Sequence, residues 1–331
     1  MMLRALLSPP LDFTLIAGFT ATAVVSFLAW VKFADADLTV LLTSVFGRSV
    51  GSLKGKVIWI TGASSGIGEC LAYELARAGA RLALSGTNKE NLAMVQARCC
   101  EMGQNVEVLT VPFDISDFAS HASQVKKVVD YFGKIDVLVN NAGRSQRAAF
   151  GEIDIATDKE MFDINVFGSV SLTRHVLKYF EAAGVRGQVV VTSSVAGKIG
   201  VPFSGTYTAT KHALHGYFEC LRIEAVVTGG TDVTMVVPGP VRSRVRERAF
   251  TAVPGQTYGL ADTPDAKLMS TERCSRLMAV AIANKLDEVW IVQNPVLVLM
   301  YLAQYMPSIF RRYLIKVIFT KERISKIREG R

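Results

Sequence analysis

Apolar and polar positions along the chain follow the patterns of buried strands and of the helices that pack on them. Short runs rich in branched and aromatic residues occur at 57–61 (VIWIT), 81–85 (RLALS), 135–139 (IDVLV) and 188–192 (QVVVT), as in strands buried on both faces. Between the first two runs, 69–79 (ECLAYELARAG) has a helical period and closes on Gly79, a suitable helix end. The order strand, glycine turn, helix, strand predicts an α/β protein with a doubly wound parallel sheet.

A charge-free run near the start of the chain, 13–31 (FTLIAGFTATAVVSFLAWV), lies between Asp12 and Lys32. At about 1.5 Å per residue, a helix of this length nearly spans a ~30 Å hydrocarbon core. A cleaved signal peptide is the alternative, although its apolar core usually has only about 7 to 15 residues. We expect an uncleaved membrane anchor within 1–32 and a linker over 33–53. The flanking charges do not indicate which side of the membrane the rest of the chain faces.

The turn after the first strand has the pattern T-G-x-x-x-G-x-G, from Thr61 to Gly68. Gly62, Gly66 and Gly68 allow the backbone to approach a pyrophosphate closely, and the N-terminus of the following helix favours its negative charge. Many tight turns contain glycine, but a glycine cluster between a strand and a helix favours a nucleotide site.

Further motifs follow this turn in a fixed order. They are NNAG at 140–143, MFDINVFGSV around Asn165, VVVTSSVAGK around Ser194, the pair Tyr207 and Lys211, and PGPV from Pro238. Together with the glycine turn, this series resembles the short-chain dehydrogenases/reductases. The resemblance implies a single Rossmann-like catalytic domain, 54–294. It also implies hydride transfer between a nicotinamide nucleotide and a carbonyl or alcohol.

The spacing of Tyr207 and Lys211 places both side chains on one face of a helix. A phenol is a weak acid with a pKa near 10, and a nearby ammonium lowers that pKa by favouring the phenolate. Ser194, after a strand, supplies a hydroxyl for the developing oxyanion. By resemblance, Tyr207 is the acid/base and contacts substrate together with Ser194. Lys211 tunes Tyr207 and binds the nicotinamide ribose, and Asn165 holds a water.

Two histidines and a second serine lie close to these residues in the sequence. His212 and His215 have no role in the family pattern, and we interpret them as surface or packing residues. Ser193 precedes Ser194 on the strand, so its side chain is expected to point into the sheet.

The end of the second strand determines which nucleotide is expected. Gly86 stands where NAD-selective members carry Asp, so no carboxylate there repels a 2′-phosphate, although Thr87 replaces the Arg of many NADP-binding members. We expect NADP(H), with NAD(H) as the alternative. No metal is expected. The residues expected to contact the cofactor are Gly62, Ser64, Ser65, Gly66, Ile67, Gly68, Ser85, Lys89, Asp114, Asn141, Gly143, Tyr207, Lys211, Pro238, Gly239 and Ser243.

The net charge of +8 is concentrated at the C-terminal end, where residues 311–331 contain eight Lys or Arg and two Glu. A nucleic-acid site would spread its charge over a folded face, so no nucleic-acid partner is expected. A basic tail beside apolar residues suits an anionic membrane surface. For the tail 295–331, three locations remain open: the membrane interface, the protein core and a second subunit of a homodimer. Before it, the irregular segment 244–266 is expected to form a mobile substrate lid.

Three other stretches, DADLTVLL, NNAGRSQR and EVWIVQNPVLVLMYLAQYMP, resemble a membrane-bound branch of the family. The resemblance implies lipid-like carbonyl or alcohol substrates, such as steroids, retinoids or xenobiotics. It also implies the endoplasmic reticulum as the location, with peroxisomes as the alternative. We therefore expect a membrane-bound, NADP(H)-dependent oxidoreductase. The rival hypotheses are a nucleotide-binding sensor or scaffold without turnover, and a lyase or epimerase that uses the same tyrosine.

Overall fold

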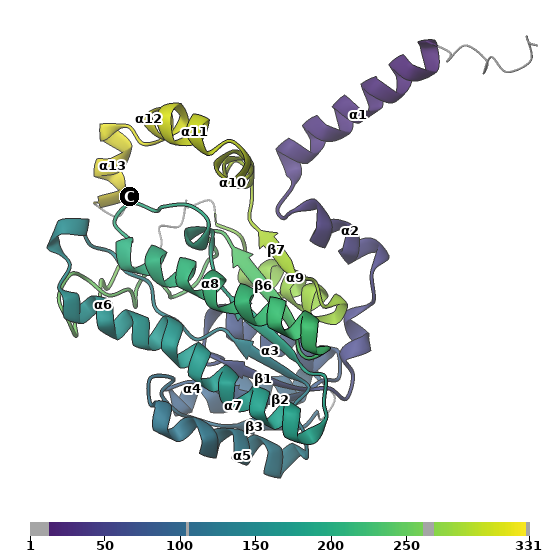
Figure 1. Ribbon diagram of the computed structural model, residues 1–331, viewed down its shortest axis with the longest axis vertical. Coiled ribbons are helices and arrows are strands. Elements are labelled where there is room, and N and C mark those ends of the chain that lie inside the picture. Colours follow the sequence, from purple (N-terminus) through teal and green to yellow (C-terminus); the bar gives the residue numbers. More distant parts are fainter. Residues whose placement is uncertain (1–12, 104–105, 261–267, 329–331) are drawn as a thin grey trace, which may run out of the picture.

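The computed structural model describes residues 13–103, 106–260 and 268–328 (Figure 1). The first twelve residues of the predicted anchor, residues 261–266 of the predicted lid and the last three residues of the tail lie outside this part.

A seven-stranded parallel sheet of the described residues forms the centre of the protein, in the order β3-β2-β1-β4-β5-β6-β7. From β1 the chain adds β2 and β3 on one side, and it then returns to add β4 to β7 on the other side of β1. This reversal of the strand order is the mark of a doubly wound fold. The predicted Rossmann-like α/β fold is thereby confirmed. The strands are β1 (Val57–Thr61), β2 (Arg81–Ser85), β3 (Val108–Thr110), β4 (Val137–Asn140), β5 (Gln188–Thr192), β6 (Asp232–Pro238) and β7 (Glu288–Ile291).

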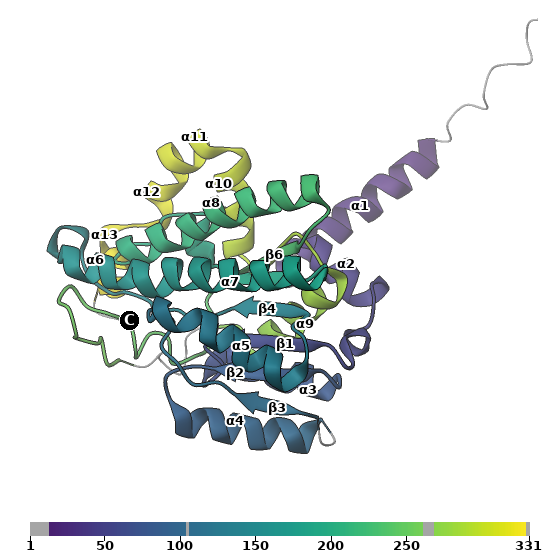
Figure 2. The ribbon, with the colours of Figure 1, turned by 60° about the horizontal axis from the view of Figure 1, so that its bottom comes forward.

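Helices cover both faces of this sheet (Figure 2). α3 (Gly66–Arg77), α4 (Lys89–Met102) and α9 (Thr271–Asn284) pack with Ile58 and Ile60 of β1 on one face. α5 (His121–Phe132), α7 (Gly168–Ala183) and α8 (Gly205–Thr228) pack with Val57 and Trp59 on the other. This alternation along one strand follows from the period of two of an extended chain. α6 (Ile155–Phe162) and a π-helical turn, Asp163–Phe167, precede α7.

The segment predicted as a linker, 33–53, is instead an ordered part of the body. α2 (Leu38–Phe46) packs against α9 through the buried Val40. The Asp37 carboxylate accepts hydrogen bonds from the main-chain N–H groups of Val40 and of Trp290 on β7. Arg273 donates two hydrogen bonds to the Asp35 carboxylate, at 2.7 and 3.0 Å. The contacts with α9 and β7 join residues more than two hundred positions apart, and local sequence patterns carry no sign of them.

The C-terminal tail begins with α10 (Val296–Tyr305), which packs on the body. Leu297 and Met300 are buried with Val195 and Val237 of the sheet layer. This helix ends at Tyr305, two residues before Pro307. The chain then continues through α11 (Pro307–Ile309), a π-helical turn at Phe310–Leu314, α12 (Ile315–Ile318) and α13 (Lys321–Arg328). For α10, core packing is the location that the structure favours.

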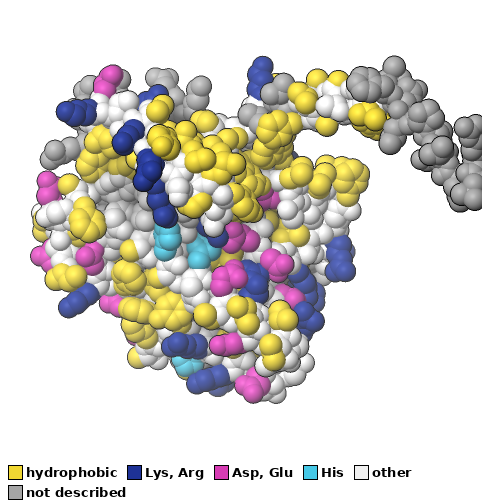
Figure 3. Space-filling view, turned by 45° about the horizontal axis from the view of Figure 1, so that its top comes forward, with side chains coloured by type: hydrophobic (Ala, Val, Ile, Leu, Met, Phe, Trp, Pro, Cys, Tyr) yellow, Lys and Arg dark blue, Asp and Glu magenta, His cyan; other side chains and the backbone are white. Residues whose placement is uncertain are grey.

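α1 (Phe13–Phe33) extends away from the body in both ribbon views (Figures 1 and 2). Its C-terminal end lies against α10, where the rings of Trp30 and Tyr301 are 5.9 Å apart. In the described ranges we find no helix with both the length and the apolar character needed to cross a membrane. Apolar side chains of α1 such as Phe19 and Val25 are exposed, and Figure 3 shows hydrophobic side chains gathered on this face of the molecule.

Candidate active site

One pocket of about 280 Å³ lies at the carboxyl ends of the strands. The segments after β1, β2, β3, β4, β5 and β6 each contribute to its lining. In open parallel sheets, ligands bind at this edge, where the strand order reverses. Of the predicted residues, those that line the pocket are Gly62, Ser64, Ser65, Gly66, Ile67, Ser85, Asp114, Asn141, Gly143, Ser194, Tyr207, Lys211, Pro238, Gly239 and Ser243.

The glycine turn is shaped by close packing that only glycine permits. Gly62 and Gly66 have positive φ values of 66° and 61°, which other residues rarely adopt. A Cβ on Gly68 would lie 2.4 Å from the Gly62 carbonyl oxygen. Gly68 is therefore absent from the pocket lining and acts by letting α3 approach β1.

Ser65 stands at the N-cap of α3 and makes no side-chain capping hydrogen bond. The first main-chain N–H groups of this twelve-residue helix therefore face the pocket, and the Ser65 side chain does not accept a hydrogen bond from them. Such N–H groups, with the helix dipole, suit a phosphate. The residues of the turn therefore fit the pyrophosphate of a dinucleotide.

Thr61, at the end of β1, connects this turn to the strand-end motif after β4. Its Oγ1 accepts hydrogen bonds from the main-chain N–H groups of Asn141 (3.0 Å) and Ala142 (3.1 Å) and donates one to the Val139 carbonyl. The Asn141 side chain donates back to the Thr61 and Gly62 carbonyls at 3.1 and 3.3 Å. The two motifs therefore hold one another in place across the switch point of the sheet.

Tyr207 and Lys211 lie in the first two turns of α8 and line the pocket, with Lys211 buried and Tyr207 partly buried. The Lys211 ammonium nitrogen is 5.7 Å from the centre of the Tyr207 ring and donates a hydrogen bond of 2.9 Å to the Thr192 carbonyl on β5. Ser194 follows β5 and hydrogen-bonds the Tyr207 side chain. The predicted Ser–Tyr–Lys set is thus brought together.

Burial has the largest influence on the pKa values of Tyr207 and Lys211. Burial raises the pKa of Tyr207, while the hydrogen bond with Ser194 and the positive charge of Arg147 oppose that rise. Burial also lowers the pKa of Lys211 to about 8. Tyr207 therefore keeps its proton at neutral pH in this structure, which suits a proton donor.

Asn165 lies in the π-helical turn Asp163–Phe167 and is fully buried, behind the pocket rather than in its lining. Its side chain accepts a hydrogen bond from the Arg144 N–H (2.7 Å) and donates to the Arg144 carbonyl (2.9 Å) and to Thr210 (3.1 Å). The amide thus joins the loop after β4 to α8. Its predicted role in holding a water stays a prediction.

Lys89 is exposed at the start of α4 and is absent from the pocket lining. Three arginines that were not among the predicted site residues do line it: Arg144, Arg244 and Arg248. Arg248 donates to Ser65 Oγ at 3.3 Å, and Arg144 lies over the Phe250 ring at 5.2 Å. Arg248 falls in the predicted lid segment, where a cluster of basic residues at 242–248 was the available signal.

The described part of the lid segment is tied to the loop after β4. Phe250 pairs with Gln146 in an isolated parallel bridge. Phe250 N–H donates to the Ser145 carbonyl at 2.9 Å, and Arg147 N–H donates to the Phe250 carbonyl at 2.8 Å. The segment therefore closes one side of the pocket mouth. Its mobility stays a prediction.

An open parallel sheet that presents a glycine turn and a Ser–Tyr–Lys set in one pocket at its strand ends defines an NAD(P)-dependent dehydrogenase or reductase. A family model described as short chain dehydrogenase matches residues 56–253. The chain belongs to this family, as the motifs predicted.

Among relatives, the chain is 41% identical to "Dehydrogenase/reductase SDR family member 7" of Homo sapiens, over 83% of this chain and 81% of that protein. Two solved structures share the fold. An alcohol dehydrogenase from Thermococcus sibiricus complexed with 5-hydroxy-NADP is 26% identical, with a TM-score of 0.63 over 73% of this chain and 97% of that one. A short chain dehydrogenase/reductase from Burkholderia phymatum in complex with NAD is 25% identical, with a TM-score of 0.65 over 78% and 96%.

Proposed function

We propose that the protein is a membrane-attached, NADP(H)-dependent oxidoreductase that interconverts a carbonyl and an alcohol on a lipid-like substrate. Steroids, retinoids and xenobiotic carbonyls are the classes to test. The observation that carries the proposed chemistry is the meeting of Tyr207, Ser194 and Lys211 at the pocket wall, beside the glycine turn.

In this proposal each residue acts on a stated atom. The bound nicotinamide supplies or accepts the hydride. Tyr207 gives its phenolic proton to the carbonyl oxygen in reduction and takes it back in oxidation. Ser194 Oγ donates to the same oxygen and stabilises its developing charge. The Lys211 ammonium, held by the Thr192 carbonyl, favours the phenolate that reduction leaves behind.

The preference for NADP(H) rests on the end of β2. Gly86 and Thr87 line the pocket there and carry no charge, so no carboxylate of theirs repels a 2′-phosphate. The Ser85 hydroxyl accepts a hydrogen bond of 2.8 Å from Trp59 Nε1 and remains able to donate one. Fluorescence titration with NADPH and NADH tests this proposal, since tighter binding of NADH would overturn it. Gly86→Asp is the matched variant and should shift the preference toward NADH.

Membrane attachment is proposed from the terminal segments. The charge-free run 13–31 and the exposed apolar side chains of α1 are the support for it, and the basic residues of 311–328 suit anionic head groups. By resemblance, the membrane is that of the endoplasmic reticulum, with the peroxisome as the alternative. Retention in the pellet after alkaline carbonate extraction is expected, and release into the supernatant would contradict it.

The function as a whole is tested by a substrate screen. Steroid, retinoid, quinone and dicarbonyl compounds are incubated with the full chain in detergent or vesicles, and oxidation of NADPH and NADH is followed at 340 nm. Turnover with at least one lipid-like carbonyl supports the proposal. Tight NADPH binding without turnover across all classes would favour the sensor or scaffold hypothesis instead.

A homodimer is also proposed. Exposed apolar residues of α8, Ile223, Val226 and Val227, are available for contact with a second copy. Sedimentation velocity in mild detergent distinguishes a monomer from a homodimer.

A further inference from the structure

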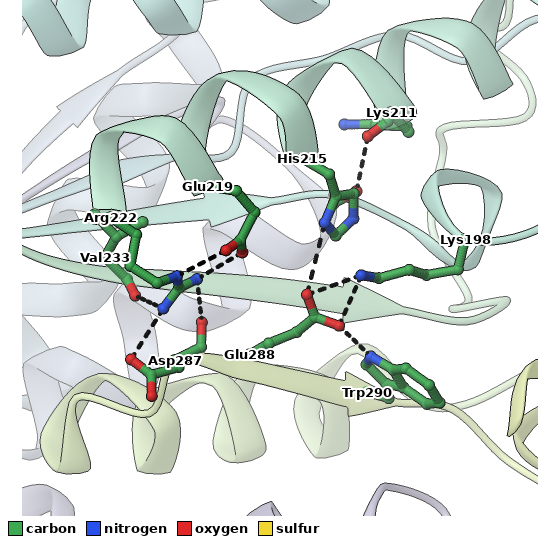
Figure 4. A network of polar contacts seen from close by, with 10 residues as sticks. Lys198, Lys211, His215, Glu219, Arg222, Val233, Asp287, Glu288 and Trp290 are labelled. Atoms are coloured by element: carbon green, nitrogen blue, oxygen red, sulfur yellow. Dashed lines mark hydrogen bonds and ion pairs between the residues drawn. The ribbon is translucent and has the colours of Figure 1, made fainter. Parts of the chain in front are cut away.

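A polar chain behind the catalytic residues links β5, α8 and β7, and it includes both residues first interpreted as bystanders, Ser193 and His215 (Figure 4). Ser193 Oγ is 3.3 Å from the Lys211 carbonyl oxygen and 3.0 Å from His215 Nε2. The Lys211 ammonium separately donates to the Thr192 carbonyl. Lys211 is therefore attached to the end of β5 twice, through its side chain and through its main chain.

His215 follows Lys211 by one helical turn, with its side chain largely buried. Its ring lies against Gly197, where a Cβ would be 2.9 Å from the imidazole. On the far side, Nδ1 is 3.6 Å from a carboxylate oxygen of Glu288 on β7. That distance is too long for a hydrogen bond, and Nδ1 has no hydrogen-bond partner among the described residues.

Glu288 is held by two other donors. Lys198 approaches both carboxylate oxygens at 2.9 Å, and Trp290 Nε1 donates at 2.5 Å. Burial disfavours the carboxylate, but these hydrogen bonds outweigh it and lower the pKa of Glu288. The carboxylate is therefore charged at neutral pH, and its charge is matched by Lys198 rather than by His215.

We assign the protons around Ser193 so that its hydroxyl donates to the Lys211 carbonyl and its Oγ accepts from the Nε2–H of His215. A neutral imidazole then presents an unprotonated Nδ1 toward Glu288, in agreement with the 3.6 Å separation. Burial, followed by the charge of Lys198, lowers the pKa of His215 to about 4, while Glu288 acts in the opposite sense. His212 and Lys211, both on α8 itself, act on the pKa of His215 in the same direction as Lys198.

We propose that His215 is a positioning residue for the catalytic site, which through Ser193 fixes the main chain at Lys211 against the strand end that carries Ser194. Lys198 forms an ion pair with the Glu288 carboxylate. This pairing keeps His215 in the neutral, Nε2-protonated form that the hydrogen bond to Ser193 requires. The inference rests on the proposed catalysis by Tyr207 and Lys211. It assigns a role to four residues that lie behind the catalytic set: Ser193, Lys198, His215 and Glu288.

The first test separates positioning from packing. His215→Leu removes the hydrogen bond to Ser193, whereas His215→Gln keeps an amide donor near the position of Nε2. We expect His215→Leu to lower kcat between roughly tenfold and a hundredfold, because displacing a catalytic group by about 1 Å has an effect of this size. The KM for the nucleotide should change by no more than about twofold, and His215→Gln should recover most of the loss. His212→Gln is the matched control, since His212 is exposed on the same helix and hydrogen-bonds the Thr208 carbonyl one turn before it.

Two outcomes would overturn the positioning role. If His215→Leu turns over as fast as the wild type, the Ser193 contact does not matter. If His215→Gln is as slow as His215→Leu, the histidine acts through its shape alone.

The second test needs no substrate, so it stands even where the proposed function fails. The chain has four histidines, and carbon-13 labelling of histidine allows each to be titrated by NMR, with His215→Gln providing the assignment. Lys198→Met frees Glu288 to pair with His215 and removes a repelling charge. The pKa of His215 should then rise from about 4 toward its ordinary value of 6.5. An unchanged pKa in Lys198→Met would overturn the role of Lys198.

Discussion

The catalytic body and the terminal helices use apolar side chains in opposite ways. Trp59 in β1 is completely buried between the sheet and its helices, whereas Phe19 and Val25 of α1 are 76% and 64% exposed. Burying one such side chain contributes about 1.5–3 kcal/mol. The body uses this free energy for its own fold, while the exposed side chains of α1 would gain it only on contact with a second apolar phase, as the proposed membrane attachment requires. Chemistry and attachment should therefore be separable by substitution.

The largest effect is expected from Tyr207→Phe in the body. Removing the phenolic proton donor should lower kcat by about 10²–10⁴-fold, while NADPH binding and the fraction bound to membranes stay unchanged. Turnover, fluorescence titration and vesicle flotation measure the three quantities. Retained turnover would remove Tyr207 from the mechanism.

The second prediction changes α1 and concerns membrane attachment rather than turnover. Phe19→Ser together with Val25→Ser removes two exposed apolar side chains, which should weaken partition into vesicles by roughly a hundredfold and leave kcat unchanged. Met94→Ser on α4 is the control, because Met94 is 63% exposed but belongs to the body. Equal effects of the two changes would mean that the attachment is not local to α1.

A smaller effect is expected within the body, at its glycines. The Cβ of Gly68→Ala meets the Gly62 carbonyl oxygen at 2.4 Å and Asn141 Nδ2 at 2.6 Å. We expect a loss of about 1–3 kcal/mol in the free energy of unfolding, together with weaker nucleotide binding. Gly216→Ala is the contrasting change, because its Cβ meets nothing within 4 Å on α8. It should stabilise the protein by about 0.5–1 kcal/mol, so chemical denaturation should give shifts of opposite sign.

The smallest effect concerns pH. The pKa of His215 is lowered from 6.5 to about 4 by burial and by Lys198, so the unfolded chain binds more protons between these values, and acidification destabilises the fold. Between pH 6.5 and 5.5 this group should lower the free energy of unfolding by about 1 kcal/mol. His215→Gln should lose that part of the pH dependence, whereas His212→Gln should keep it. Denaturation curves at the two pH values decide between these outcomes.

The sequence predicted those features whose residues are close together in the chain. The turn from Gly62 to Gly68 and the pair Tyr207 and Lys211 are defined by local spacing, which a strand and a helix convert directly into geometry. The alternating faces of β1 follow in the same way. The parallel order of the strands was accessible because one strand–helix–strand unit constrains the handedness of the next.

Other features depend on contacts between distant residues. The burial of Asp37 against Trp290 needs β7 to lie at the sheet edge beside α2, and the contact of His215 with Ser193 and Glu288 needs three elements to meet. The effect of burial on the pKa values of Tyr207 and Lys211 was also not accessible, because the spacing of the two residues does not reveal their surroundings in the fold. These contacts affect the electrostatics of the site and the coupling between its elements, but not which fold the chain adopts.

The attachment of residues 35–40 to β7 and α9 bears on how a shortened, more soluble form of the protein should be made. A chain that begins at residue 54 would discard Asp35 and Asp37, leaving the Arg273 guanidinium without its ion pair and the Trp290 N–H without its acceptor. It would also uncover the apolar surface of α9 that Val40 now covers. A chain that begins at residue 33 removes nearly all of α1 and keeps each of these contacts. The appropriate place to shorten this protein is therefore before Ala34, some twenty residues ahead of the first strand of its sheet.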